Sequence, residues 1–217
     1  MTANVLLARE LELRSRAAKE TLLIGLNSLD ALTSGFPRGA ISEITGPESS
    51  GRATLVQSLL AAATAHQEIC VYVDTSDSFD PVSADSSRIL LSQLVWIRCN
   101  GNTEHAFQAT DELLHAGGFG VIVLDLCRVA DRHIRRIPLS YWYRFRRAVE
   151  NTSTILAVLG REPLAKSCAS LVLELKQARI AWPGSPAVRL LGEVETSITA
   201  RKPVRSAMAK LQAKAVG

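Results

Sequence analysis

The fold is decided by residues 43–55, which read Glu43-Ile44-Thr45-Gly46-Pro47-Glu48-Ser49-Ser50-Gly51-Arg52-Ala53-Thr54-Leu55. Both glycines have the spacing of the phosphate-binding pattern G-x-x-x-x-G-K-[ST], a loop that joins a strand to a helix. The lysine position holds Arg52, and the serine/threonine position holds Ala53. The residues that shape the loop are therefore present, whereas the two that handle the γ-phosphate and the metal are replaced.

Strands and helices alternate on both sides of this loop. Apolar, β-branched runs predict strands at 40–45, 68–74, 94–99, 120–126, 154–159 and 167–175, with edge strands within 188–200. The predicted helices are 25–35, 52–65, 87–94, 103–117 and 138–150, and the Ser/Asp-rich stretch 75–85 predicts a loop. We therefore expect an α/β fold, a three-layer domain of the P-loop NTPase type with a mainly parallel central sheet.

The two ends of the chain differ from this middle part. Residues 1–20 alternate charges with Leu7 and Leu11 and predict a helical arm, residues 21–200 form the α/β domain, and residues 201–217 are a basic tail without an acid. We expect the tail to be a solvated end. The alternative is a partner-binding helix that carries Ala207, Met208 and Leu211.

Composition sets the outer limits on function. The chain has 217 residues, a formal net charge of +4 and a pI of about 9.0, which permits an acidic partner without requiring one. No apolar run approaches the roughly 18 residues of a membrane span, so we expect no membrane contact and a cytoplasmic location. The four cysteines form no CxxC pair and the four histidines show no ligand spacing, so we expect reduced buried thiols and no metal site.

Over roughly residues 25–178, the order of these segments resembles RecA-type recombinases. The best match is Gly46–Gly51, which is similar to the RecA phosphate loop ahead of its lysine. The stretch 29–39 is similar to the lead-in to that loop, Phe79-Asp80-Pro81 resembles the segment that meets adenine, and Val121–Asp125 resembles the Walker B strand. In an open sheet of this kind, ligands bind at the carboxyl ends of the strands, which places the loop, Asp74 and Asp125 at one edge.

The resemblance implies an altered nucleotide site. The candidate nucleotide-binding residues are Gly46, Glu48, Ser49, Ser50, Gly51, Arg52, Ala53, Thr54, Asp80 and Asp125. Ser76 stands where RecA has its water-activating glutamate, Ser83 where it has the adenine-stacking tyrosine, and Leu159-Gly160 where an Asn-Gln pair relays the nucleotide state. We expect no catalytic residue and no meaningful ATPase activity, while weak binding of ATP and Mg²⁺ stays open.

A basic segment, residues 128–147, is the second functional signal. Its candidate partner or DNA contacts are Arg128, Arg132, Arg135, Arg136, Tyr141, Trp142, Arg144 and Arg147. Arginine with aromatic residues suits phosphate contact and base stacking, and it equally suits a protein interface. A solvated arginine face with Trp142 packed inward is the third interpretation, and the sequence leaves all three open.

A short RecA-like chain with these replacements and a basic tail is most similar to the ImuA family, RecA-like accessory proteins of bacterial mutagenic translesion synthesis. Only residues 160–166 stand where RecA carries its long DNA-threading loop. The resemblance implies a role in the DNA-damage (SOS) response through contacts with RecA and with translesion polymerase subunits of the ImuB-like and DnaE types. The alternatives are a weak ATP-binding, DNA-binding RecA homologue and a SulA-like inhibitor of cell division.

Overall fold

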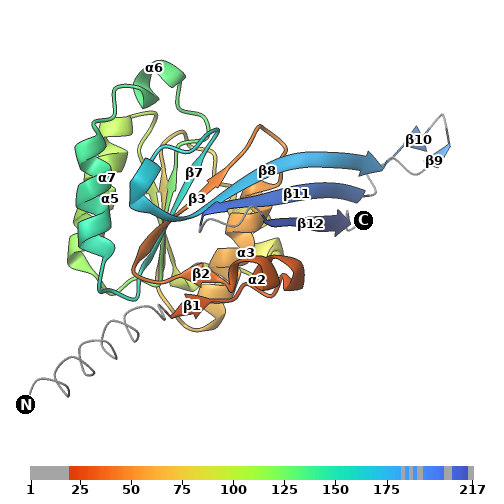
Figure 1. The fold of residues 1–217 in the computed structure, drawn as a ribbon, viewed down its shortest axis with the longest axis horizontal. Helices are drawn as coiled ribbons and strands as arrows, with labels where there is room; N and C mark the ends of the chain where they lie inside the picture. Colours follow the sequence, from red (N-terminus) through yellow and green to blue (C-terminus); the bar gives the residue numbers. More distant parts are fainter. Residues whose placement is uncertain (1–19, 182–183, 186–187, 190–192, 203–206, 215–217) are drawn as a thin grey trace, which may run out of the picture.

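A computed structural model of the chain describes residues 20–181, 184–185, 188–189, 193–202 and 207–214. Its centre is an eight-stranded sheet with the strand order β12-β11-β8-β3-β7-β6-β4-β5 (Figure 1). Every pair from β8 to β5 is parallel, whereas β11 runs antiparallel to both β8 and β12. This topology confirms the prediction of an α/β fold with a mainly parallel sheet.

The elements follow the predicted alternation. The strands are β1 (Thr21–Leu22), β2 (Phe36–Pro37), β3 (Ala40–Thr45), β4 (Cys70–Asp74), β5 (Leu94–Arg98), β6 (Val121–Asp125), β7 (Ile155–Gly160), β8 (Ala169–Ala181), β9 (Gly184–Ser185), β10 (Val188–Arg189), β11 (Glu193–Lys202) and β12 (Ala207–Lys214). The helices are α2 (Asn27–Thr33), α3 (Arg52–Ala65), α4 (Pro81–Ser86), α5 (Thr103–Ala116), α6 (Asp131–Ile134) and α7 (Leu139–Val149), with 3-10 turns η1 (Leu91–Gln93) and η2 (Lys166–Cys168).

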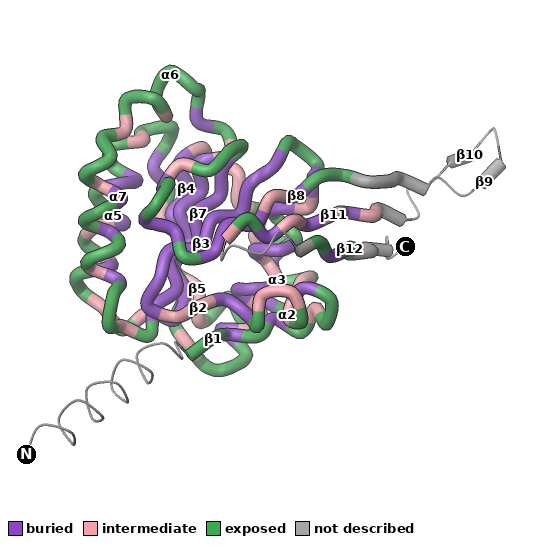
Figure 2. The backbone as a smooth tube through the Cα atoms, in the orientation of Figure 1, coloured by how far each residue is buried: buried purple, intermediate pink, exposed green. Residues whose placement is uncertain are grey.

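The sheet is covered on both faces, which gives the three layers. Helices α2 and α3 lie on one face, and α5 and α7 lie on the other (Figure 1). The central strands are therefore buried on both sides, and β3, β4, β6 and β7 consist of buried residues throughout (Figure 2). This double burial explains why β4, β6 and β7 are nearly continuous apolar runs rather than alternating patterns.

The two core clusters differ in character. The α3 side is mainly aliphatic, with Leu55, Leu59 and Leu60 of the helix packed on the sheet. The α5/α7 side contains a group of aromatic rings, in which Phe107 of α5 lies 5.4 Å from Trp142 and 5.5 Å from Phe145, both of α7, between ring centroids. This aromatic contact holds α5 and α7 against each other and fixes the outer layer of that face.

Two predictions between β4 and β5 were wrong in detail. The stretch 75–85, expected as a loop, contains α4, because the Asp80 carboxylate accepts hydrogen bonds from the amides of Val82 and Ser83 and Pro81 occupies the first turn. The helix expected at 87–94 is only the turn η1. Ile89 is buried in the core, whereas Leu90 and Leu91 are exposed, so the apolar residues of this segment do not form one helical face.

The C-terminal segment also differs from expectation. Residues 207–214 form strand β12, which pairs with β11 from Ala207 to Lys214 instead of forming a solvated end or a helix. The hydroxyl of Ser28 in α2 donates to the carbonyl oxygen of Lys210 at 3.3 Å, so α2 lies along this strand. The strand forms because its backbone pairs with β11, and this contact between separate segments cannot be seen in the local sequence pattern of residues 207–214. The predicted arm at 1–20 lies outside the described residues except for Glu20, and the division into three segments stays a prediction.

The aromatic cluster generates a stability prediction. Replacing Phe145, which has no exposed surface, by alanine removes the ring that both Phe107 and Trp142 contact. We expect the free energy of unfolding to fall by about 3–5 kcal/mol, the usual cost of such a core truncation. Urea denaturation followed by tryptophan fluorescence measures this change.

Tyr143 provides the matched control, since it lies on the same helix but is 57% exposed. Tyr143→Ala should change the unfolding free energy by less than about 0.5 kcal/mol. Equal losses for the two variants would contradict the assignment of faces.

Candidate functional site

The loop between β3 and α3 retains the shape that its glycines predict. Gly46, Ser49 and Gly51 have positive φ angles of 150°, 60° and 90°. A Cβ atom built on Gly46 would lie 2.3 Å from the carbonyl oxygen of Leu175 in β8, so only glycine fits there. The loop amides and the first turn of α3 are thus held at the carboxyl edge of the sheet, the arrangement that favours anions.

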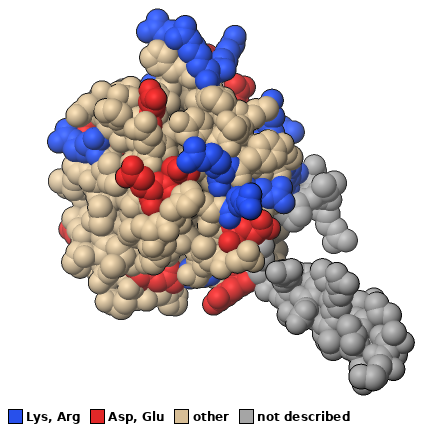
Figure 3. All heavy atoms as spheres, turned by 90° about the vertical axis from the view of Figure 1, so that its left-hand side faces the viewer, with Lys and Arg blue, Asp and Glu red and all other residues tan. Residues whose placement is uncertain are grey.

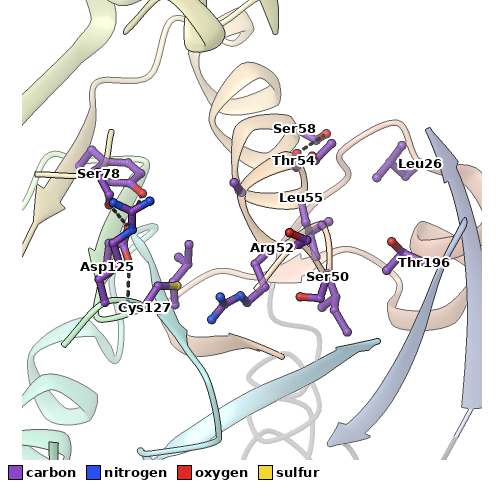
Figure 4. A pocket seen from close by; sticks show the side chains of 17 residues that line it. Leu26, Ser50, Arg52, Thr54, Leu55, Ser58, Ser78, Asp125, Cys127 and Thr196 are labelled. Carbon is purple, nitrogen blue, oxygen red and sulfur yellow. Dashed lines mark hydrogen bonds between the residues drawn. The ribbon is translucent and has the colours of Figure 1, made fainter. Parts of the chain in front are cut away.

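A cavity of about 470 Å³ opens at this edge, between the loop, α3 and the ends of β4 and β6 (Figure 4). Of the candidate nucleotide-binding residues, the structure brings together Ser49, Ser50, Gly51, Arg52, Ala53, Thr54 and Asp125 in its lining. Gly46 and Glu48 belong to the loop but not to the lining, and Asp80 caps α4 instead. Arg128, assigned from sequence to the basic segment, lines this cavity.

Arg52 is buried rather than extended into the cavity as a free cation. Arg52 is the first residue of α3 and is only 7% exposed. Its Nη1 donates a hydrogen bond of 2.6 Å to the carbonyl oxygen of Gly160, the last residue of β7. In Figure 4 the side chain reaches toward Cys127, on the side of the cavity where Asp125 lies. The guanidinium therefore joins the phosphate-loop helix to the end of a neighbouring strand.

Asp125 is surrounded by hydrogen-bond donors. Its Oδ2 accepts from the Tyr72 hydroxyl at 2.8 Å and from the Ser78 hydroxyl at 3.0 Å. Its Oδ1 accepts from the amide of Cys127 at 2.8 Å. Burial raises the pKa of Tyr72 well above its ordinary value, and the nearby Asp125 carboxylate acts in the same direction. The Tyr72 hydroxyl therefore keeps its proton and donates a hydrogen bond to the Asp125 carboxylate, which accepts three hydrogen bonds in all.

Asp74 organises the loop that follows β4. Its carboxylate accepts hydrogen bonds from the amides of Ser76, Ser78 and Phe79 and from the Trp96 indole at 3.2 Å. Asp77, the next acid, lies outside the cavity lining and accepts a hydrogen bond from Arg98 at 2.6 Å. The end of β4 therefore presents a fixed hydrogen-bonded turn beside the cavity.

Glu43 is a buried acid that sequence reasoning did not select. It is 1% exposed in the middle of β3, and its Oε1 accepts from the amides of Leu164 at 2.5 Å and Ala165 at 2.8 Å. Its Oε2 has no hydrogen-bond partner among the described residues. Burial raises the pKa of Glu43, and the two amides oppose that rise. A charged residue inside a predicted central strand was the signal that could have revealed it.

The basic segment divides into three parts in the structure. Arg132, Arg135 and Arg136 are exposed at and beside α6, and Arg147 is exposed on α7. Arg144 pairs with Asp111 of α5 and lies 5.8 Å over the ring of Tyr141. Trp142 is 2% exposed, as the inward-packed interpretation expected, whereas Tyr143 and most of the arginines of this segment are exposed.

The fold and the glycine-shaped loop define a domain of the P-loop α/β class. The model of the RecA N-terminal domain family matches residues 10–131, and the chain belongs to that family. It is 34% identical to Protein RecA of Chloroflexus aurantiacus over 116 residues, which cover 52% of this chain and 33% of the relative. It is 39% identical to Protein RecA of Brucella canis over 108 residues, covering 49% and 30% respectively. The chain thus spans about a third of the length of these curated relatives.

None of the helices among the described residues is both long and apolar enough to cross a membrane. No group of three or more His, Cys, Asp or Glu side chains within the described part of the chain is arranged to hold a metal ion.

The contact between Arg52 and Gly160 generates a second prediction. Arg52→Met keeps much of the buried stem but removes the donor, which leaves the Gly160 carbonyl without that bond. We expect the unfolding free energy to fall by about 1.5–3 kcal/mol, the usual range for a hydrogen bond to a charged group. Chemical denaturation measures this change, and hydrogen exchange should rise in residues 160–165.

Arg128→Met is the matched control, since Arg128 lines the same cavity but is exposed. Its effect should stay within about 0.5 kcal/mol. An Arg52→Met variant as stable as the parent would show that the contact contributes nothing to the fold.

Glu43 generates a prediction about pH. The pKa of this carboxyl is raised in the folded state, so the stability linked to it is fully present below the ordinary glutamate pKa and is lost as the pH rises through the raised value. Glu43→Gln cannot ionise. The stability of the parent relative to this variant should therefore decrease as the pH increases from about 4 to 7.

Thermal unfolding of both proteins across this pH range provides the measurement. Glu174→Gln serves as the control, because the pKa of Glu174 is lowered, chiefly by its hydrogen bond with Arg201, and its effect must have the opposite sign. Parallel stability curves for Glu43→Gln and the parent would contradict the prediction.

Proposed function

We propose that this chain is a non-catalytic, RecA-like accessory protein of the DNA-damage response that acts through protein contacts. One observation carries the proposal: the residue at the position of the catalytic lysine, Arg52, is buried and bonded to the Gly160 carbonyl. A side chain held in this way does not extend toward a γ-phosphate. Arginine also differs from lysine in shape, because its planar head does not reproduce a compact ammonium group.

The residues present do not fit a metal-bound triphosphate. Ala53 offers no hydroxyl to Mg²⁺, and the Asp125 carboxylate already accepts three hydrogen bonds from protein groups. Metal and lysine contributions would both be lost, and general-base assistance alone is typically worth about 10²–10⁴-fold. These features support the absence of meaningful ATP hydrolysis.

Weak binding of a nucleotide or anion is the second candidate, and a specific observation favours it. The loop amides and the N-terminus of α3 keep the geometry that attracts phosphate. The hydroxyl of Ser50, a buried residue in the cavity lining, has no hydrogen-bond partner among the described residues. This candidate predicts stabilisation by ATP that does not require Mg²⁺.

Protein contacts are the proposed replacement for catalysis. Only residues 161–168 connect β7 to β8, and Glu43 holds two of their amides, so the segment is short and tied to the sheet. The exposed arginines around α6 suit an acidic protein surface. By resemblance to the ImuA family, the proposed partners are RecA and translesion polymerase subunits of the ImuB-like and DnaE types.

The test is an ATPase assay in the presence and absence of single-stranded DNA, with RecA as the positive control. We expect turnover at least about 10²-fold below that of RecA, with no stimulation by DNA. DNA-stimulated hydrolysis by the purified chain, abolished by Arg52→Ala, would overturn the proposal.

Coprecipitation tests the positive half of the proposal. The chain should retain RecA or a translesion polymerase subunit at moderate salt, and it should do so without nucleotide. Failure with each of these partners would remove the accessory role, whatever the result of the ATPase assay.

A further inference from the structure

A second cavity lies on the opposite face of the sheet from α3. It has a volume of about 540 Å³ and is formed between the first turn of α5 and the corner that joins α6 to α7. This volume falls within the usual range for binding pockets, about 300–1,000 Å³. Gly101, in the turn that leads into α5, has a φ of 81°, and a Cβ atom built there would meet nothing within 4 Å. The turn before the helix therefore leaves this space open.

The floor of the cavity is apolar and already formed. Phe107 and Tyr141 meet edge to face, with ring centroids 5.2 Å apart, and Ile137 and Pro138 complete the wall. Phe107 is also stacked on Phe145 in the core, so the floor rests on buried side chains. A pocket of this kind suits an apolar side chain from another molecule, because no rearrangement is needed to receive it.

One lip of the cavity carries unused hydrogen-bond donors. The Asn102 side chain caps α5 by accepting from the amide of His105, and the first-turn amides of Thr103 and Glu104 have no partner within the helix. The hydroxyl of Thr103 is buried and has no hydrogen-bond partner in the described structure. These donors lie at the positive end of a 14-residue helix, which favours a carboxylate.

The other lip is cationic. His133 and Arg136 line the cavity from the α6 side, and Arg132 and Arg135 are exposed next to them. Figure 3 shows Lys and Arg side chains covering the projecting end of the molecule where α6 lies. Asp131, the acid of this segment, faces Arg161 with 3.9 Å between Oδ1 and Nη1. The surface beside the apolar floor is thus complementary to negative charge.

We propose that this cavity binds an acidic peptide segment of a partner protein. An apolar side chain of the peptide contacts Phe107, Ile137 and Tyr141, and its neighbouring carboxylates meet Arg136 and the N-terminus of α5. The inference deepens the proposed function and rests on it, since it names the kind of partner segment and the place where it binds.

The cavity favours a peptide over a nucleic acid for two reasons. The ring of Tyr141 has its edge contact with Phe107 on one side and the Arg144 guanidinium on the other, so it offers no free platform for a base. Glu104 lies in the lining and would repel a continuous phosphate backbone. A peptide can place its carboxylates selectively, whereas a polyanion cannot.

The experiment measures fluorescence anisotropy with three probes on the full chain. The first is a labelled short peptide in which a Leu-Phe pair is flanked by Asp and Glu, the second replaces that pair by Ala-Ala, and the third is a single-stranded oligonucleotide of the same net charge. We expect the first probe to bind about tenfold or more tightly than the other two, the difference that one buried apolar anchor supplies. Arg136→Glu and Ile137→Ala should each weaken its binding by about tenfold.

Arg147→Glu is the matched control, because Arg147 is an exposed arginine of α7 outside the cavity. Its effect should stay within about twofold, as expected for a remote exposed charge. The inference would be overturned if Arg136→Glu and Arg147→Glu weakened binding equally, or if the Ala-Ala probe bound as tightly as the first probe. It would also be overturned if the oligonucleotide displaced the peptide, or if the first probe did not bind. If the Arg136→Glu variant still coprecipitates RecA or the polymerase in full, the cavity is not the binding site for that partner, but the accessory role still stands.

Discussion

The arrangement of the phosphate-loop edge depends on the hydrogen bond between the Arg52 guanidinium and the Gly160 carbonyl. This bond joins the first residue of α3 to the last residue of β7, two residues that are 108 positions apart in the sequence. Because the guanidinium is buried, removing the bond would leave both a charge and a carbonyl poorly satisfied. An arginine at this position is therefore better explained as part of the structure than as a substitute for a phosphate-binding lysine.

The segment after β7 is held at a second point, which makes this end of the sheet rigid. Arg52 fixes Gly160 at its start, and the Glu43 carboxylate fixes the amides of Leu164 and Ala165 near its end. Arg161, between them, donates to the carbonyl oxygen of Cys127 at 3.3 Å. Contacts from three different elements leave few degrees of freedom to a connection of this length. Such a surface is suited to constant presentation to a partner rather than to a change driven by a ligand.

The sequence predicted the parallel core well because both of its signals are local. Gly46 and Gly51 are required by backbone geometry, and the buried strands are apolar because both faces are covered. What it did not predict depends on contacts between distant residues. The direction of Arg52 is set by a carbonyl 108 positions away, the role of Glu43 by amides 121 and 122 positions away, and strand β12 by pairing with β11. The cavity beside α5 was missed for the same reason, since its walls come from two separate helices and a turn.

The two cavities differ in how far the hydrogen bonds of their polar groups are satisfied within the protein. At the phosphate-loop edge, polar side chains that would serve a nucleotide are bonded to one another, as Asp125 is to Tyr72 and Ser78. Beside α5, the Thr103 hydroxyl has no hydrogen-bond partner among the described residues, and the amides of Thr103 and Glu104 have none within the helix. Arg136 is exposed there next to an apolar floor. Unsatisfied donors next to apolar surface are costly in an isolated protein and favourable once a complementary group covers them. The Ser50 hydroxyl is also unsatisfied at the phosphate-loop edge of the described structure. It is therefore the combination of unsatisfied donors, an exposed arginine and an apolar floor that supports the proposed peptide site on the α5–α6 side.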